Sequence, residues 1–274
     1  MNRLSTTLTL LFLAATVSSV APAADWEPKL IDRWEINLGS YFTGIDTTIR
    51  LDSELDIPGT PIDFEKDLEF DDSEVLPRIS VALLLGKRHQ FRLGYYRTDR
   101  EASGTVRQEF EWGDLVFPID VGYRAFVDVK FIEASYTLYF VAKEKTAIGG
   151  ILGLVYLDAS AGIALNAFGI GIGGEADYQT DLPVPQIGLT LRQMLPARFV
   201  LTGTGMFLSI NNISEVSGDM WNANVALEHR TFKNFGFGVA YTVTSIGIES
   251  EREDFPGKLD FEIGGFQLYL RFGF

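Results

Sequence analysis

The sequence contains no cysteine, which excludes disulfides and thiol chemistry, although this absence alone identifies no cellular compartment. Histidine is scarce, with two residues in 274, so a catalytic mechanism that depends on histidine has two candidates. Beyond the first 23 residues the sequence has no clean apolar run of 18 residues, so a membrane-spanning helix is not expected. The nearest candidate, residues 147–174, is interrupted by Asp158 and carries eight glycines, a composition suited to strands and loops.

Positive charge is also in short supply, with 23 lysines and arginines against 37 aspartates and glutamates and a formal charge of −14. We expect residues 1–23 to be a cleaved signal peptide, because Arg3 precedes an apolar core over residues 8–17 and small residues follow at 21–23. The core is too short for an anchoring helix, which is the alternative for this segment. Cleavage removes one positive charge and leaves −15 on the mature chain, which argues against nucleic acid as a partner.

The last fourteen residues show the clearest pattern in the chain. From residue 266 onward apolar and mostly polar side chains alternate, with Gln267, Tyr269 and Arg271 on one face. The opposite face is wholly apolar and consists of Phe266, Leu268, Leu270, Phe272 and Phe274. This alternation predicts a strand with lipid on one side and water on the other, as in a barrel wall.

Ten alternating segments occur along residues 33–274, and the connections between them switch between short and long. The short connections lie near residues 86–89, 143–146, 195–197 and 233–234. The long ones lie near residues 51–74, 108–122, 166–183, 212–218 and 250–257. Bacterial outer-membrane barrels have short periplasmic turns and long external loops. The pattern therefore predicts an all-β fold, a transmembrane antiparallel up-and-down β-barrel of about ten strands, preceded by a periplasmic segment over residues 24–32.

Within the segments, one set of alternate residues is apolar and is expected to face lipid: Ile79, Val81, Leu83 and Leu85; Ile132, Tyr136, Leu138 and Phe140; Ile187, Leu189 and Leu191; Trp221, Ala223, Val225 and Leu227. The intervening residues are mostly polar and are expected to face the lumen: Arg78, Ser80, Ala82 and Leu84; Glu133, Ser135 and Thr137; Gln186, Gly188, Thr190 and Arg192; Asn222, Asn224, Glu228 and Arg230. A slip of one residue would move every polar set into lipid, so the register is expected to be well fixed.

Two segments resist this assignment. Phe91, Leu93 and Tyr95 face outward in the third segment, but strict continuation would aim Arg97 and Asp99 at lipid. Either the membrane band ends there or a bulge at residues 95–96 reverses the pattern, and we favour the bulge. The fifth segment, residues 147–165, is apolar on both faces and its orientation stays open.

Aromatic side chains gather near the expected strand ends, as is typical of interfacial girdles. They are Trp34, Trp112, Tyr123, Trp221, Phe232, Phe235, Phe272 and Phe274.

These features together resemble a known class. Residues 33–274 resemble Gram-negative outer-membrane β-barrel proteins, and residues 267–274 are similar to the carboxyl-terminal strand signal that the barrel assembly machinery recognises. The stretch over residues 59–68, followed by the acidic residues 71–72, is similar to an acidic first external loop in uncharacterised barrels of this size. The resemblance implies an outer-membrane location, lipid and lipopolysaccharide as surroundings, and the assembly machinery and periplasmic chaperones as partners during biogenesis. It implies no activity.

Charged residues of both signs are expected inside the barrel: Glu35, Arg78, Arg92, Glu133, Arg192, Glu228, Arg230 and Arg271. A ten-stranded wall leaves a narrow lumen once side chains project inward, so these charges must pair or stay hydrated. The favoured interpretation is an internal network of ion pairs and water that seals the barrel. The alternative is a narrow, porin-like pore for small solutes, in which five arginines against three glutamates favour anions.

Dedicated binding and catalytic sites are not expected. The loop over residues 51–74 carries ten acidic residues, but these lack the spacing of a calcium loop, so a solvated loop is favoured over a metal site. The glycine-rich residues 169–174 lack the lysine of a phosphate loop, and no cofactor is expected.

Neither histidine is placed for catalysis. His89 is expected in a short periplasmic turn and His229 near the periplasmic end of its strand, facing outward. A carboxylate pair among Asp99, Glu101 and Glu109 at the external rim has no supporting spacing.

We therefore expect a monomeric, non-enzymatic outer-membrane barrel that is either structural or a narrow passive pore. The alternatives are a surface enzyme acting on lipid or peptide as a hydrolase or acyltransferase, and a binding or adhesion barrel that uses the loops at 108–122 and 166–183.

Overall fold

The computed structural model describes residues 26–52, 59–107, 109–112, 115–117, 119–166, 175–213, 216–252 and 255–274. In this part of the chain the strands are β1 (Trp34–Leu51), β2 (Ile62–Asp63), β3 (Ser73–Leu85), β4 (His89–Thr105), β5 (Phe110–Trp112), β6 (Leu115–Phe117), β7 (Gly122–Ala142), β8 (Thr146–Asn166), β9 (Glu175–Met194), β10 (Phe199–Ile213), β11 (Val216–His229), β12 (Phe235–Arg252) and β13 (Phe255–Gly273). One short 3₁₀ helix, η1 (Pro196–Arg198), lies between β9 and β10. The described residues contain no helix long and apolar enough to cross a membrane.

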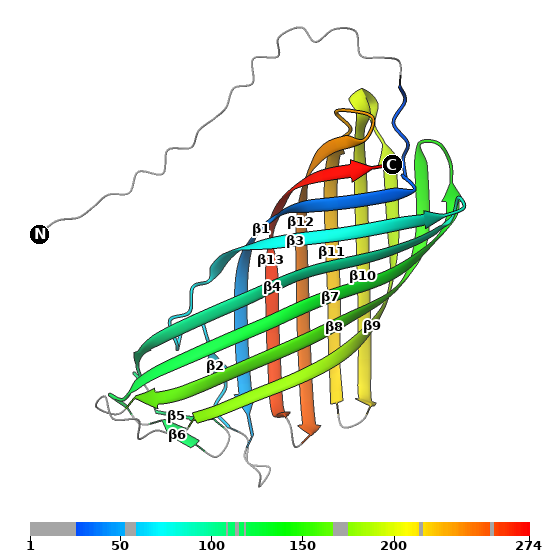
Figure 1. The fold of residues 1–274 in the computed structure, drawn as a ribbon. Helices are drawn as coiled ribbons and strands as arrows, with labels where there is room; N and C mark the ends of the chain where they lie inside the picture. Colours follow the sequence, from blue (N-terminus) through cyan, green and yellow to red (C-terminus); the bar gives the residue numbers. More distant parts are fainter. Residues whose placement is uncertain are drawn as a thin grey trace, which may run out of the picture.

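Ten of these strands form a closed antiparallel barrel (Figure 1). Sequential neighbours pair in the order β1, β3, β4, β7, β8, β9, β10, β11, β12 and β13, and β13 pairs with β1 to close the wall. The closing ladder is long, from Glu35 opposite Gly273 to Leu51 opposite Gly257. The prediction of an all-β barrel with ten strands is confirmed.

The four short connections also lie where the sequence predicted them, at one end of the barrel. Both ends of the wall meet at this turn end, because the Trp34 and Phe274 main chains bond each other at 2.9 and 3.1 Å. The opposite end, or loop end, differs from prediction. The predicted loops at 166–183, 212–218 and 250–257 are too long, since the flanking strands run on to residues 166 and 175, 213 and 216, and 252 and 255. Of the two remaining predicted loops, 51–74 contains β2 and 108–122 contains the β5–β6 hairpin.

The predicted lipid-facing set of β13 points out of the barrel, and Leu268, for example, is 54% exposed. The outward and inward sets predicted for β3, β7, β9 and β11 also follow the observed alternation. In β8, the segment without a predicted orientation, Ile151, Val155 and Leu157 point inward.

The predicted bulge at residues 95–96 is wrong. The β4–β7 register runs without interruption from His89 opposite Leu138 to Thr105 opposite Gly122. Arg97 and Asp99 therefore do face outward, and Arg97 bonds Asp128 on the neighbouring strand. The apolar outer band ends instead, because charged side chains replace apolar ones on the same outer face.

An aromatic row marks this boundary. On one side of the barrel Tyr95, Ile132 and Tyr156 are cross-strand neighbours, and on the other side Phe42, Phe266 and Tyr241 are. We call the barrel between the short connections and this row the turn half, and the barrel beyond it the loop half. The turn half has an apolar outer face, which spans eight residue steps in β13 from Phe266 to Phe274. Eight steps of about 3.3 Å, tilted by about 40°, cover roughly 20 Å, close to the apolar band of about 25 Å in outer-membrane barrels.

The loop half reverses this arrangement and has an apolar interior. Its buried cluster draws on nine of the barrel strands and on the segment between β1 and β3: Tyr41, Ile45, Ile49, Ile62, Phe64, Leu68, Phe70, Leu76, Tyr96, Val106, Tyr123, Ala125, Val127, Val129, Phe131, Val155, Leu157, Ile163, Val184, Met220, Ile246, Phe261 and Ile263. The assignment of Tyr123 to an interfacial girdle is therefore wrong, since this ring packs inside the barrel. Trp34, Trp221, Phe232 and Phe274 are exposed on the outer face, whereas the side chain of Trp112 lies outside the described part.

Candidate functional site in the barrel interior

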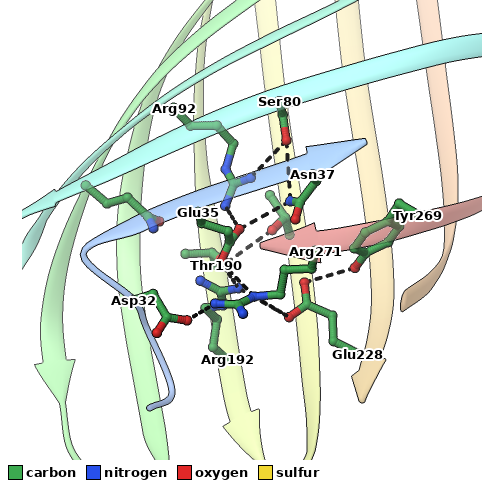
Figure 2. A network of polar contacts seen from close by, with 12 residues as sticks. Asp32, Glu35, Asn37, Ser80, Arg92, Thr190, Arg192, Glu228, Tyr269 and Arg271 are labelled. Carbon is green, nitrogen blue, oxygen red and sulfur yellow. Dashed lines mark hydrogen bonds and ion pairs between the residues drawn. The ribbon is translucent and has the colours of Figure 1, made fainter. Parts of the chain in front are cut away.

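All eight charged residues proposed for the lumen lie inside the turn half. Arg78 and Glu133 pair with each other at 2.6 Å near the middle of the barrel. The other six meet near the turn end, together with Asp32 (Figure 2). We call this group the arginine–carboxylate network, and it consists of Asp32, Glu35, Arg92, Arg192, Glu228, Arg230 and Arg271.

Glu35 of β1 is the central acceptor of the network. It is 1% exposed and receives hydrogen bonds from Arg92 of β4 at 2.7 Å and from Arg192 of β9 at 3.2 Å. The Nε atom of Arg271, on β13, lies 3.7 Å from the same carboxylate. A buried carboxylate with a single partner would be costly, whereas three guanidinium groups around it offset the desolvation. The network thereby joins strands that are far apart around the wall.

Glu228 of β11 is the second acceptor. Arg230 approaches it at 3.1 Å, and the Tyr269 hydroxyl donates to it at 3.0 Å. The Tyr269 ring reaches Glu228 across β12 because residue 238 is glycine; a Cβ there would lie 2.4 Å from the ring. The inward glycine at 238 therefore makes room for a polar contact.

The third acceptor, Asp32, comes from the segment that precedes β1. Its carboxylate bonds Arg230 at 3.2 Å and also contacts Arg271. Leu30 of the same segment is buried against Tyr139, Ala147 and Val200. The segment over residues 26–33 thus folds into the turn-end opening rather than extending away from it. Sequence reasoning missed this contact, although the apolar pair at residues 30–31 beside an acid was a signal for it.

A polar cavity of about 200 Å³ lies in the middle of the barrel, next to the network on its side toward the loop half. Its walls come from all ten barrel strands and are rich in hydroxyl and amide groups, among them Asn37, Ser80, Gln90, Ser135, Thr137, Gln186, Thr190, Thr202, Thr204, Asn222, Asn224, Thr242 and Gln267. Gln186 is buried and neither atom of its amide has a hydrogen-bond partner. A chamber of this size and polarity has room for several waters.

An aromatic and charged layer closes the cavity toward the loop half. The Arg78 guanidinium lies 4.9 Å from the centre of the Tyr96 ring, and that ring stacks on Phe131 at 4.5 Å. Tyr41 meets Tyr96 edge to face at 6.1 Å and donates a hydrogen bond to the main chain of residue 242 at 3.1 Å. Because cation–π and ring contacts favour fixed geometries, this layer separates the polar chamber from the apolar core.

The acidic segment before β3 fills the loop half. The four apolar side chains that we call the loop plug are buried inside the barrel: Ile62, Phe64, Leu68 and Phe70. The expectation of a solvated loop at residues 51–74 is wrong for this part of it. Four apolar residues interleaved with acids were the available signal, because a hydrated loop gains nothing from such side chains.

Buried polar contacts hold the loop plug in place. Arg100 of β4 bonds Glu65 at 2.5 Å and the Thr47 hydroxyl at 2.7 Å. Glu65 also accepts a hydrogen bond from the Thr47 main chain at 2.7 Å. At the exposed tip, Lys66 donates to Asp63, and this hydrogen bond raises the pKa of Lys66.

The candidate catalytic groups do not converge. His89 begins β4 at the turn end and bonds the Tyr136 hydroxyl at 2.7 Å, and His229 packs between Phe199 and Phe237. Asp99 and Glu101 face outward and pair with arginines of the outer surface. The described residues contain no group of three or more His, Asp or Glu side chains that could hold a metal ion. The glycine-rich residues 169–174 and the signal segment 1–23 lie outside them.

Comparison with known proteins identifies the fold through similarity to solved structures. No family model matches the chain, and no curated protein matches it either. Among solved structures, the outer-membrane protease OmpT from Escherichia coli is similar with a TM-score of 0.59 and 9% identity, over 91% of this chain and 99% of that chain. The fold is that of a Gram-negative outer-membrane β-barrel.

Two weaker similarities are to barrels of the same kind. The translocator domain of the autotransporter NalP from Neisseria meningitidis gives a TM-score of 0.48 at 11% identity, covering 88% of each chain. The attachment invasion locus protein Ail of Yersinia pestis gives 0.34 at 10% identity, covering 88% of this chain and 97% of that one. At these identities the likeness concerns the fold alone and transfers no residue role.

Proposed function

We propose that the chain is an integral barrel of the Gram-negative outer membrane whose interior is closed, so that it is a structural rather than a solute-conducting protein. The observation that carries this proposal is the double closure of the interior. The arginine–carboxylate network and the segment over residues 26–33 occupy the turn end, and the loop plug occupies the loop half.

The two closures differ in kind. At the turn end, Arg271, Arg230 and Glu228 are nearly fully buried, so ion pairs rather than mobile water fill the cross-section. In the loop half, packed rings and aliphatic side chains fill the described interior, and the polar groups buried among them, Arg100, Glu65 and Thr47, are bonded to one another. An ion crossing the barrel would need to displace both, and breaking a buried ion pair costs several kcal/mol.

The apolar outer face of the turn half supports a membrane location. Under this proposal the turn end lies in the periplasm and the loop end outside, after removal of a signal peptide over residues 1–23. The partners would then be outer-membrane lipid and lipopolysaccharide, with the assembly machinery and periplasmic chaperones acting during biogenesis. A monomer suits a wall that has no unpaired strand edge.

The proposal includes the lack of enzymatic activity. It is supported by the positions of His89 and His229 at the turn end and by the outward, paired state of Asp99 and Glu101. A second candidate function is binding at the loop end. It is favoured by the apolar core of the loop half, which makes the strands beyond the membrane band a rigid platform.

Single-channel recording of the mature protein in a planar bilayer tests the closure. We expect no conductance steps from protein whose insertion has been shown by strand circular dichroism and protease protection in vesicles. The matched variant replaces Phe64 and Phe70 with Ser, which loosens the loop plug and leaves the turn half unchanged. Steps in this variant alone would identify the loop plug as the tighter seal. Reproducible steps from the wild-type protein would overturn the proposal and favour the pore.

A further inference from the structure

The charges inside the turn half do not balance. The network holds four guanidinium groups, Arg92, Arg192, Arg230 and Arg271, against the three carboxylates of Asp32, Glu35 and Glu228. Glu35, Arg92, Arg192 and Glu228 of the network line the cavity, together with Arg78 and Glu133, which neutralise each other. The network as a whole, which lies at the turn end of the cavity, is therefore one negative charge short. An uncompensated charge in a buried site costs several kcal/mol, so a counter-charge is favoured there.

The unused hydrogen-bond donors lie at the turn end of the cavity. Arg192 is 3% exposed, and its Nε and Nη1 atoms have no partner, although its Nη2 bonds Glu35. Thr202 of β10 stands directly opposite Arg192 of β9 in the ladder, and its buried hydroxyl also has no partner. Both side chains line the cavity. A cation edge and a hydroxyl donor are thus held side by side facing the chamber.

A third free donor comes from Gln90 of β4. Tyr139 bonds the amide oxygen of Gln90 at 2.9 Å, which leaves the buried Nε2 atom without a partner. Tyr139 in turn packs against Ala147, the residue of β8 that stands opposite Arg192. The unpartnered atoms of Arg192 and Gln90 are donors and the Thr202 hydroxyl can donate, so these three groups suit an acceptor that carries negative charge. The cavity lining also holds two unpartnered acceptors, the amide oxygens of Asn37 and Gln186.

We propose that the cavity binds one small monovalent anion, held by the free edge of Arg192 and the hydroxyl of Thr202, with the amide of Gln90 turned toward the same side. A halide and the carboxylate of a very small organic acid share the required chemistry. The volume of about 200 Å³ admits either one together with ordered waters, since a water occupies about 30 Å³. A doubly charged anion does not fit this balance, because the network lacks one charge and already holds three carboxylates.

Bromide is the probe for this site. Crystals of the full mature chain exchanged into bromide should show an anomalous peak beside Arg192 and Thr202. Thermal unfolding in chloride, bromide, acetate and a bulky sulfonate at equal ionic strength distinguishes the sources. A higher Tm in chloride and bromide alone identifies a halide, and a higher Tm in acetate alone identifies a small carboxylate. An empty cavity in bromide, together with one Tm in all four salts, would overturn the proposal.

Variants at position 202 make the test specific. Thr202→Asp supplies the missing charge opposite Arg192, so we expect no bromide peak and no dependence of Tm on the anion. Thr204→Val is the matched control, because its hydroxyl already has Thr190 as a partner, and it should bind bromide like the wild type. If Thr202→Asp does not fold, Thr202→Val decides: we expect roughly tenfold weaker bromide binding from the lost charge-assisted hydrogen bond. Unchanged binding in Thr202→Val, or a bromide peak in folded Thr202→Asp, would refute the site.

Discussion

The turn half and the loop half share the same strands but place their apolar side chains on opposite faces. In β13 the turn half presents Phe266 and Leu268 outward and Tyr269 and Arg271 inward, whereas the loop half buries Phe261 and exposes Glu262. No bulge separates the two parts of β13 in its ladder with β1. The backbone alternation is therefore constant, and the medium outside the wall decides which face is apolar.

This comparison explains why the interior is closed. A wall surrounded by lipid satisfies its apolar requirement outside and is free to carry charge inside. A wall surrounded by water must bury apolar side chains inside, as in a soluble protein. The side chains of the wall strands do not fill the centre of the loop half by themselves. The segment between β1 and β3 adds Phe64, Leu68 and Phe70 to the apolar cluster there.

The largest effect is expected from a charge placed inside the loop half. Phe261→Arg removes a ring that packs 6.0 Å from Phe131 and buries a cation without a partner. We expect a loss of about 5 kcal/mol in the free energy of unfolding, from cavity formation and charge burial together. Urea unfolding in lipid vesicles, followed by tryptophan fluorescence, measures it. The neighbouring substitution Glu262→Leu, on the outer face, should change stability by about 0.5 kcal/mol or less. Equal losses in the two variants would mean that the faces of the loop half are misassigned.

The next effect is the reverse experiment in the turn half. Leu268→Arg puts a cation on the lipid face at a cost of about 2 to 4 kcal/mol, and we expect it to block assembly. Gln267→Arg, one residue away, points into the polar cavity and should be tolerated. The fraction of folded protein in outer-membrane preparations, read from the mobility of unheated samples on gels, compares them. Similar folded fractions would contradict the assignment of lipid and lumen faces.

The sequence was sufficient to predict the strands of the barrel wall and the direction in which their side chains face. It was insufficient to predict which side chains meet inside the barrel. Alternation at Leu268, Val225 and Leu189 is a local property, so strand number and facing followed from short windows. The change of pattern at Arg97 is visible in the sequence, but alternation alone does not distinguish a bulge from the end of the membrane band, and the favoured bulge is the wrong one of the two. The placement of Tyr123 fails because an aromatic near a strand end has no built-in preference for lipid over a core.

The contents of the barrel depend on contacts that no local pattern encodes. Asp32 meets Arg230 across 198 positions of sequence, and Arg192 meets Glu35 across 157. Inward charges were predicted individually, but which of them converge depends on barrel tilt and side-chain length. Predicting the loop plug would have needed two facts together. Phe64 and Phe70 are costly to leave in water, and the wall strands leave space in the interior that these two side chains can fill.

The smallest effect tests where the boundary between the halves lies. Lys130 is the outward residue just beyond Ile132 on β7 and bonds Asp158 of β8 at 3.0 Å. Because this pair is partly exposed to water, Lys130→Met should cost about 0.5 kcal/mol or less. Leu152→Lys, in the middle of the apolar band of β8, should cost about 2 to 4 kcal/mol. Unfolding in vesicles measures both. A cost for Lys130→Met as large as that for Leu152→Lys would mean that Lys130 makes interactions inside the membrane and that the boundary lies further toward the loop end. A small cost keeps the boundary at the row of Tyr95, Ile132 and Tyr156, where the outer face changes from apolar to charged while the ladder continues unbroken.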